Sequence, residues 1–160
     1  MLAFVVILYA SCTAPYTTFT DTYYIHNATD NVISLTTEHP VVWDTCAPEN
    51  PQKVWFDSTT IFLKAGKTIR LHPIVREFKY KSVSVNDRLN VTWLIGTSTR
   101  LTAGTDTIVW QVQHNYMFES DSVWSIYNKR DWQTIKDNDL PYTYYHTFEI
   151  TSEKIERNKL

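Results

Sequence analysis

The segment TIVWQVQHNYMF, residues 107–118, decides the fold that we expect for this chain. Large, mostly apolar side chains occupy its even-numbered positions: Ile108, Trp110, Val112, His114, Tyr116 and Phe118. Polar side chains occupy most of the odd-numbered ones: Thr107, Gln111, Gln113 and Asn115. A period of two suits a strand with one buried face and does not suit a helix. We therefore predict a long strand here, roughly 40 Å from end to end.

The composition extends this prediction to the whole chain. With 160 residues and 43% hydrophobic content, the chain is long enough for one domain with a proper core. Six Trp and ten Tyr, together with many Thr and Val, suit the half-buried surfaces of pleated sheets. Because there are only three glycines, turns must depend on Asn, Asp, Ser and Pro. The composition indicates an all-β protein.

Further strands are expected wherever short extended segments lie between turn residues. They are residues 22–26, 32–35, 41–43, 54–56, 60–63, 67–71, 78–85, 89–95, 122–127 and 144–151. Gly66, at a left-handed position, would join 60–63 and 67–71 as a hairpin. Residues 128–139, which contain Trp132 and Ile135, are compatible with one short helical turn.

This spacing of short strands predicts a single-domain antiparallel β-sandwich, with a closed β-barrel as the alternative. A true immunoglobulin domain carries a Cys, a Trp and a second Cys at characteristic separations. Without its signal peptide this chain would keep one cysteine, so we expect an immunoglobulin-like architecture without its disulfide.

The amino-terminal residues are typical of a processing signal. An uncharged apolar run, residues 2–10, is followed by Ser11, Thr13 and Ala14, as in a short secretory signal peptide. Cleavage is expected after Ala14 or after Cys12, and a bacterial lipidation box at residues 9–12 is the competing interpretation. The run is too short to span a bilayer, and no second apolar run of spanning length follows. The expected organisation is therefore a signal peptide (1–14), a β-sandwich domain (15–151) and a charged flexible tail (152–160).

Two cysteines are present, Cys12 and Cys46. Removal of the signal peptide would leave Cys46 without a partner in its own chain. Three fates remain open for Cys46: a buried free thiol, an intermolecular disulfide that links a homodimer, or a bond to a retained Cys12.

Two N-glycosylation sequons agree with secretion, at Asn27 and at Asn90. In the predicted strand 89–95 the apolar residues share one face and Asn90 points the other way. A glycan on Asn90 would then project into solvent.

The sequence offers no catalytic, metal or cofactor motif. A net charge of −2 without a basic block argues against nucleic acid or an anionic membrane as a partner. The histidines do not occur at metal-ligand spacings, although His114 and His146 share the core parity of their strands and could meet. Carboxylates are scattered, and there is no glycine-rich phosphate loop. We therefore expect a protein that is not an enzyme and that binds neither metal nor cofactor.

Aromatic residues near loops are the predicted binding residues. They are Trp43, Trp55, Trp124, Trp132, Tyr142 and Tyr145. The expected function is that of a secreted N-glycosylated protein that engages another extracellular or cell-surface protein, for example a host-directed immunomodulator of a virus or parasite. One alternative is a lipocalin-like carrier with a cavity lined by Trp110, Tyr116 and Phe118. The other is a carbohydrate-binding module with coplanar exposed tryptophans.

Overall fold

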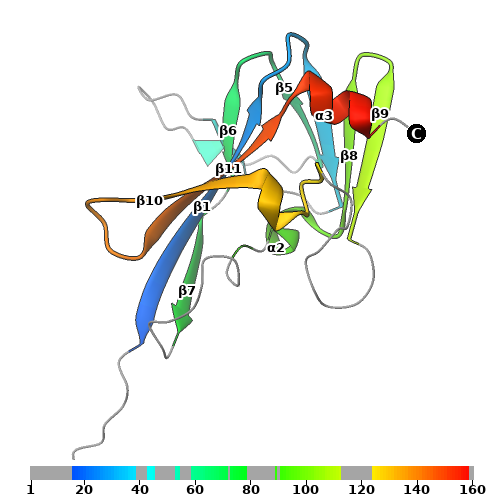
Figure 1. The fold of residues 1–160 in the computed structure, drawn as a ribbon. Coiled ribbons are helices and arrows are strands. Elements are labelled where there is room, and N and C mark those ends of the chain that lie inside the picture. Colours follow the sequence, from blue (N-terminus) through cyan, green and yellow to red (C-terminus); the bar gives the residue numbers. More distant parts are fainter. Residues whose placement is uncertain are drawn as a thin grey trace, which may run out of the picture.

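The computed structural model describes residues 16–38, 43–45, 53–54, 59–71, 73–78, 89, 91–112 and 124–158. Two β-sheets pack against each other, and they do not close into a barrel (Figure 1). The predicted sandwich is confirmed. No helix in these ranges is both long enough and apolar enough to cross a membrane. The predicted signal peptide, Cys46, Trp55, Asn90 and His114 lie outside the described residues.

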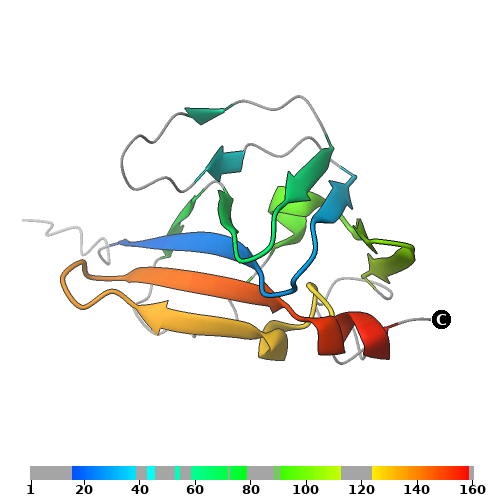
Figure 2. The same ribbon diagram turned by 90° about the horizontal axis from the view of Figure 1, so that it is seen from above.

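The larger sheet has seven strands. In spatial order they are β10 (Trp132–Lys136), β11 (Thr143–Ile150), β1 (Thr17–Asn27), β6 (Thr68–Leu71), β3 (Trp43–Thr45) and β4 (Lys53–Val54), and β7 (Ile74–Phe78) also pairs with β1. The smaller sheet has four strands, in the order β5 (Thr60–Leu63), β2 (Ile33–Thr37), β8 (Ser98–Ala103) and β9 (Asp106–Gln111). Figure 2 shows β1, β11 and β10 running side by side, with β10 at the edge.

Strand β9 begins the segment that decided the predicted fold. Ile108 and Trp110 are buried, whereas Val109 between them is exposed, which confirms the alternation. Strand β9 ends at Gln111 after six residues. It is therefore shorter than the predicted strand of roughly 40 Å. Residues 113–118 lie outside the described residues.

Aromatic rings join the two sheets at the centre of the core. The ring of Trp110, from the smaller sheet, meets Phe148 of β11 edge-on, with the ring centroids 5.6 Å apart. Trp132 packs against Phe148 at 5.4 Å and against Tyr23 at 5.7 Å. Large rings bury the most area per residue, so this cluster contributes strongly to the stability of the sandwich.

One pair of central strands departs from the expected antiparallel arrangement. Strands β1 and β11 run parallel, with Thr20 paired to Thr143 and Asn27 to Ile150. The antiparallel prediction is wrong for this pair because alternation records which face is buried and not which way the neighbouring strand runs. The other strand pairings of the described residues are antiparallel.

The predicted hairpin at residues 60–71 is a crossing between sheets. Gly66 has a φ of 67°, so the left-handed turn is confirmed. However, β5 pairs with β2 in the smaller sheet, whereas β6 pairs with β1 in the larger one. The turn residues set the change of direction but not the partner of each strand, and the hairpin prediction is wrong.

Two predicted strands, 89–95 and 122–127, are not strands in the parts that the structure describes. In the segment 89–95 the chain forms the short helix α2 (Thr92–Ile95), which places Val91 and Ile95 in the core. Short apolar runs fit a buried helical turn as well as a strand, which explains the error. Residues 124–127 form turns, and neighbouring Ile126 and Tyr127 are both buried, which a half-buried strand does not permit.

The last third combines one confirmed helical turn with two strands. The 3-10 helix η1 (Lys129–Asp131) lies within the predicted segment, but Trp132 and Ile135 belong to strand β10. The predicted closing strand is confirmed as β11, where His146, Phe148 and Ile150 are buried.

The tail predicted to be flexible forms helix α3 (Ser152–Arg157). Its N-cap is Thr151, whose side-chain oxygen accepts a hydrogen bond from the Lys154 backbone N–H. Ile155 is buried, and the Lys154 ammonium donates to the Glu149 carbonyl at 2.6 Å while lying 4.3 Å from the centroid of the Phe148 ring. Burial lowers the pKa of Lys154. A docked helix replaces the predicted flexible tail because two of its side chains are held against the sandwich.

Candidate functional site

The predicted binding aromatics whose side chains the structure describes do not form one cluster. Trp132 is buried in the core, so its prediction as a surface contact is wrong. Trp124 is half-buried, with the Arg157 guanidinium 4.9 Å from its ring centroid. Tyr142 packs against Phe19 with the ring centroids 5.1 Å apart. Trp132 therefore offers no surface, and Trp124 and Tyr142 are each half-buried against a neighbouring side chain.

Strand β3 contains Trp43 and pairs with β4 and β6. The sixth predicted residue, Trp55, lies outside the described part of the chain.

Tyr145 lies on the outer face of the larger sheet, opposite the face that carries His146 and Phe148. Ile135 of β10 is its cross-strand partner on one side, and Thr22 of β1 lies on the other. The ring of Tyr24 lies 6.3 Å from the ring of Tyr145. Val75 of β7 pairs with Thr20 and therefore belongs to the same face. We call the surface formed by Tyr24, Val75, Ile135 and Tyr145 the tyrosine face.

The tyrosine face exposes two aliphatic side chains to solvent. Ile135 is 65% exposed and Val75 is 62% exposed. Uncharged threonines lie between Ile135 and Val75. Thr20 of β1 pairs with Val75 on one side and with Thr143 of β11 on the other. Two charged residues adjoin members of this face: Arg70 of β6 is the cross-strand partner of Tyr24, and Asp137 follows β10 beside Tyr145.

A hydrogen bond fixes the position of the Tyr145 ring. Its hydroxyl donates to Asp137 at 2.5 Å, and the same carboxylate accepts the backbone N–H groups of Asp139 and Leu140. The bond from Tyr145, followed by those from the two backbone N–H groups, lowers the pKa of Asp137. The bond to Asp137 raises the pKa of the Tyr145 hydroxyl. The ring is thus held in place at the surface.

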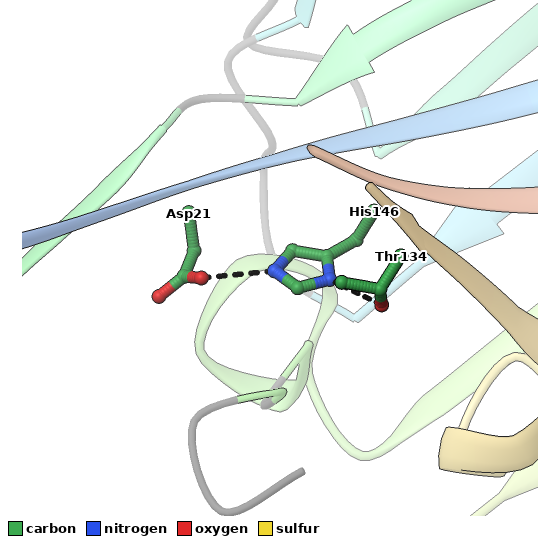
Figure 3. Close-up of polar contacts among 3 residues, drawn as sticks. All are labelled: Asp21, Thr134 and His146. Atoms are coloured by element: carbon green, nitrogen blue, oxygen red, sulfur yellow. Dashed lines mark hydrogen bonds and ion pairs between the residues drawn. The ribbon is translucent and has the colours of Figure 1, made fainter. Parts of the chain in front are cut away.

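A second site lies on the opposite, inner face of the same strands (Figure 3). His146 of β11 is bonded through Nε2 to the Asp21 carboxylate and through Nδ1 to the Thr134 hydroxyl, each at 2.9 Å. Asp21 and His146 are fully buried, and Tyr23 stacks on the imidazole at 4.8 Å between ring centroids. A carboxylate oxygen accepts and the imidazole N–H donates in the pair of Asp21 with Nε2, whereas the Thr134 hydroxyl can either donate to Nδ1 or accept from it.

This order of hydroxyl, imidazole and carboxylate is the one that hydrolases use to activate a nucleophile. Here, however, Thr134 and His146 are directly opposite each other in an antiparallel pair, where side-chain hydrogen bonds are ordinary cross-strand contacts. Asp21 and His146 have no solvent-accessible surface through which a substrate could reach them. We assign the network a structural role: it satisfies two buried polar groups and fixes the parallel β1 and β11 strands.

The sequence pattern predicted only one member of this network. The parity of residues 144–151 placed His146 on the core face, but Asp21 precedes the predicted strand 22–26, and β1 in fact begins at Thr17. Continuing the alternation of Tyr23 and Ile25 backwards would have placed Asp21 on the buried face. No cluster of three or more His, Cys, Asp or Glu side chains suited to a metal occurs in the described ranges.

The first sequon has a structural role that conflicts with glycosylation. Asn27 is fully buried where the chain leaves β1. Its amide nitrogen donates to the carbonyls of Asn31 and Leu63, at 2.8 and 2.9 Å. Its side-chain oxygen accepts from both the backbone N–H and the hydroxyl of Thr29. Both amide hydrogens are used and there is no exposed surface, so the folded domain has no room for a glycan on Asn27.

No protein family model, curated protein or solved structure matches the chain.

We expect the Asn27 peptide to be unmodified when the full chain is expressed in eukaryotic cells and recovered from the medium. Peptide mass mapping before and after enzymatic removal of N-glycans measures this. If the protein carries a glycan, the variant Asn90→Gln should lose all of it. Glycan mass on the Asn27 peptide of folded protein would contradict the hydrogen bonding described above.

Proposed function

We propose that this protein is a secreted, non-catalytic binding protein that engages another extracellular protein through the tyrosine face. The observation that carries the proposal is the exposure of Ile135 and Val75, at 65% and 62%, on the same sheet face as Tyr24 and Tyr145. A solvated sheet face normally carries polar side chains, so exposed apolar groups gathered on one face favour a role in binding.

The chemistry of the tyrosine face supports a protein partner. Interface centres are rich in tyrosine and poor in charge, and they are surrounded by a polar rim. Tyr24 and Tyr145 supply large amphipathic surfaces, and the bond from Tyr145 to Asp137 reduces the entropy lost when a partner packs on that ring. Threonines between the apolar side chains offer hydroxyl groups to the partner without burying a charge.

The extracellular compartment rests on the sequence. An apolar run at residues 2–10 followed by small residues is typical of a secretory signal, and the Asn90 sequon agrees with it. A host-directed immunomodulator of a virus or parasite is one kind of protein with this combination of features. The partner class that we propose is a folded extracellular domain with an uncharged, partly apolar surface.

The two alternative functions have less support. A carrier needs a ligand cavity, but Trp110, one of its expected lining residues, packs against Phe148 in the core. A carbohydrate-binding module needs coplanar exposed tryptophans, but of the tryptophans whose burial the structure describes, Trp110 and Trp132 are buried and Trp124 is half-buried.

Substitutions on the tyrosine face should weaken binding, and the assay is biolayer interferometry against a panel of purified extracellular domains. For the domain that binds, we expect Tyr145→Ala to raise Kd by about 30-fold, the loss expected of an interface hot spot. Val75→Lys should raise it by about tenfold, because a charge would be buried at the interface.

The matched control is Phe62→Ser. Phe62 is 74% exposed but lies on β5 in the other sheet, so its loss should leave Kd unchanged. Equal effects of Phe62→Ser and Tyr145→Ala, or no effect of Tyr145→Ala in folded protein, would refute the proposed surface.

A further inference from the structure

Strand β10 is an open edge of the larger sheet and forms one border of the tyrosine face. Within the described ranges it pairs with β11 on one side and with no strand on the other (Figure 2). Its five residues contain no proline, and they pair with β11 without an interruption in register. Lys136, its one charged residue, lies at its end. An edge of this kind offers unpaired backbone N–H and C=O groups to a strand of another protein.

The pairing with β11 shows which backbone groups of β10 point outward. The N–H of Asp137, the residue after β10, donates to the carbonyl of Thr143 in β11 at 2.9 Å. Successive residues of a strand turn their N–H and C=O groups to opposite sides, so the odd-numbered residues of β10 also bond toward β11. The N–H and C=O groups of Thr134 and Lys136 therefore point to the open edge.

Ile135 is the side chain that a strand added to this edge would cover. It is 65% exposed and lies beside Tyr145 on the outer face. In an added antiparallel strand, the residue opposite Ile135 belongs to a non-hydrogen-bonded pair, in which the side chains of the two strands are closest. An apolar side chain at that position would therefore be favoured.

Charges of both signs flank β10. They are Lys129, Arg130 and Asp131 before its first residue, and Asp137 and Asp139 after its last. A partner surface of one sign would meet both attraction and repulsion here. Backbone pairing and apolar contact must then supply the recognition, in agreement with the uncharged, partly apolar partner surface proposed above.

We propose that the extracellular partner adds one of its own edge strands to β10, so that the two proteins share one continuous sheet. This mode of binding depends on the function proposed above for the tyrosine face and specifies the partner's contact element. That element is an extended segment of about four to six residues. It places an apolar side chain against Ile135 and bonds through its backbone to Thr134 and Lys136, while neighbouring parts of the partner cover Tyr145.

Amide hydrogen exchange, measured by NMR on isotope-labelled protein, tests strand addition directly. The probe is the extracellular domain that binds in the interferometry panel. We expect the N–H groups of Thr134 and Lys136 to exchange quickly in the free protein and about tenfold or more slowly in the complex. Gln133 and Ile135 bond toward β11 in both states, so their exchange should change little.

A proline at position 136 removes one of the outward donors. Lys136→Pro should leave the ladder with β11 intact, because an edge strand tolerates proline where the N–H faces away from its neighbour. We expect it to raise Kd by about tenfold, the loss of one hydrogen bond at the interface. The matched control Lys136→Ala removes the same side chain but keeps the N–H, so Kd should stay within about threefold. Urea denaturation should show that both variants are folded.

The outcomes separate strand addition from the function proposed for the tyrosine face. If Tyr145→Ala weakens binding but the amides of Thr134 and Lys136 exchange as fast in the complex as in the free protein, the tyrosine face is retained and strand addition is overturned. Equal Kd values for folded Lys136→Pro and Lys136→Ala would also overturn strand addition. If the two amides are protected while Tyr145→Ala has no effect, the partner binds the edge and the tyrosine face is the proposal that fails.

Discussion

Replacing Asp21 with alanine is expected to lower the free energy of unfolding by about 3–5 kcal/mol, the loss expected when one partner of a buried polar pair is removed. His146 would lose the acceptor at Nε2, 2.9 Å away, and would remain fully buried with an unsatisfied N–H. The two residues come from the parallel strands β1 and β11, so their separation also weakens the centre of the larger sheet. Urea denaturation followed by tryptophan fluorescence measures the effect.

Thr134→Ala is the matched control for Asp21→Ala. It removes the other hydrogen bond of the same imidazole, but residue 134 is exposed, so water can replace the hydroxyl at Nδ1. We expect a loss of about 1 kcal/mol or less. If Asp21→Ala cost no more than Thr134→Ala, the network would not fix the strands as we describe.

Replacing Ile155 with alanine is expected to cost about 2–5 kcal/mol, the range for an isoleucine truncated in a packed core. Ile155 is 6% exposed and belongs to the main hydrophobic cluster, although it lies in the segment that the sequence predicted to be a flexible tail. Thermal or urea unfolding of the variant decides between the two descriptions, because truncation in a flexible tail would change stability by less than about 0.5 kcal/mol.

Ile135→Ala provides the comparison with identical chemistry. Ile135 is 65% exposed, so the same deletion of atoms should cost about 1 kcal/mol or less. Equal losses at both positions would mean that α3 does not pack as described.

The signals for α3 were present in the sequence. Thr151 is a favourable N-cap residue, and Glu153 and Arg157 are spaced for an ion pair, which the structure forms at 2.8 Å. A helix of six residues is nevertheless unstable alone, and it depends on Ile155 and Lys154 packing against the sandwich. Local sequence indicates where such a helix can begin, but the surface that stabilises it comes from distant strands.

The tyrosine face was predicted in part. Tyr145 was among the predicted binding residues, but Tyr24, Val75 and Ile135 were not. Their strands lie far apart in sequence and become neighbours only through the order of β10, β11, β1 and β7 in the larger sheet. Trp132 was predicted to bind because it lies near a loop, yet it is the one buried residue of β10 and lies opposite Phe148.

The sequence by itself determined that this is a β protein and which side of several strands is buried, since alternation is a property of each strand taken singly. Only the tertiary structure decided that β1 and β11 run parallel, that β5 and β6 separate into different sheets, and that Asp21 meets His146. The physical reason is that an alternating strand buries the same side chains against any neighbour in either direction. Its partner is chosen by the packing of the whole core, here around Trp110, Trp132 and Phe148.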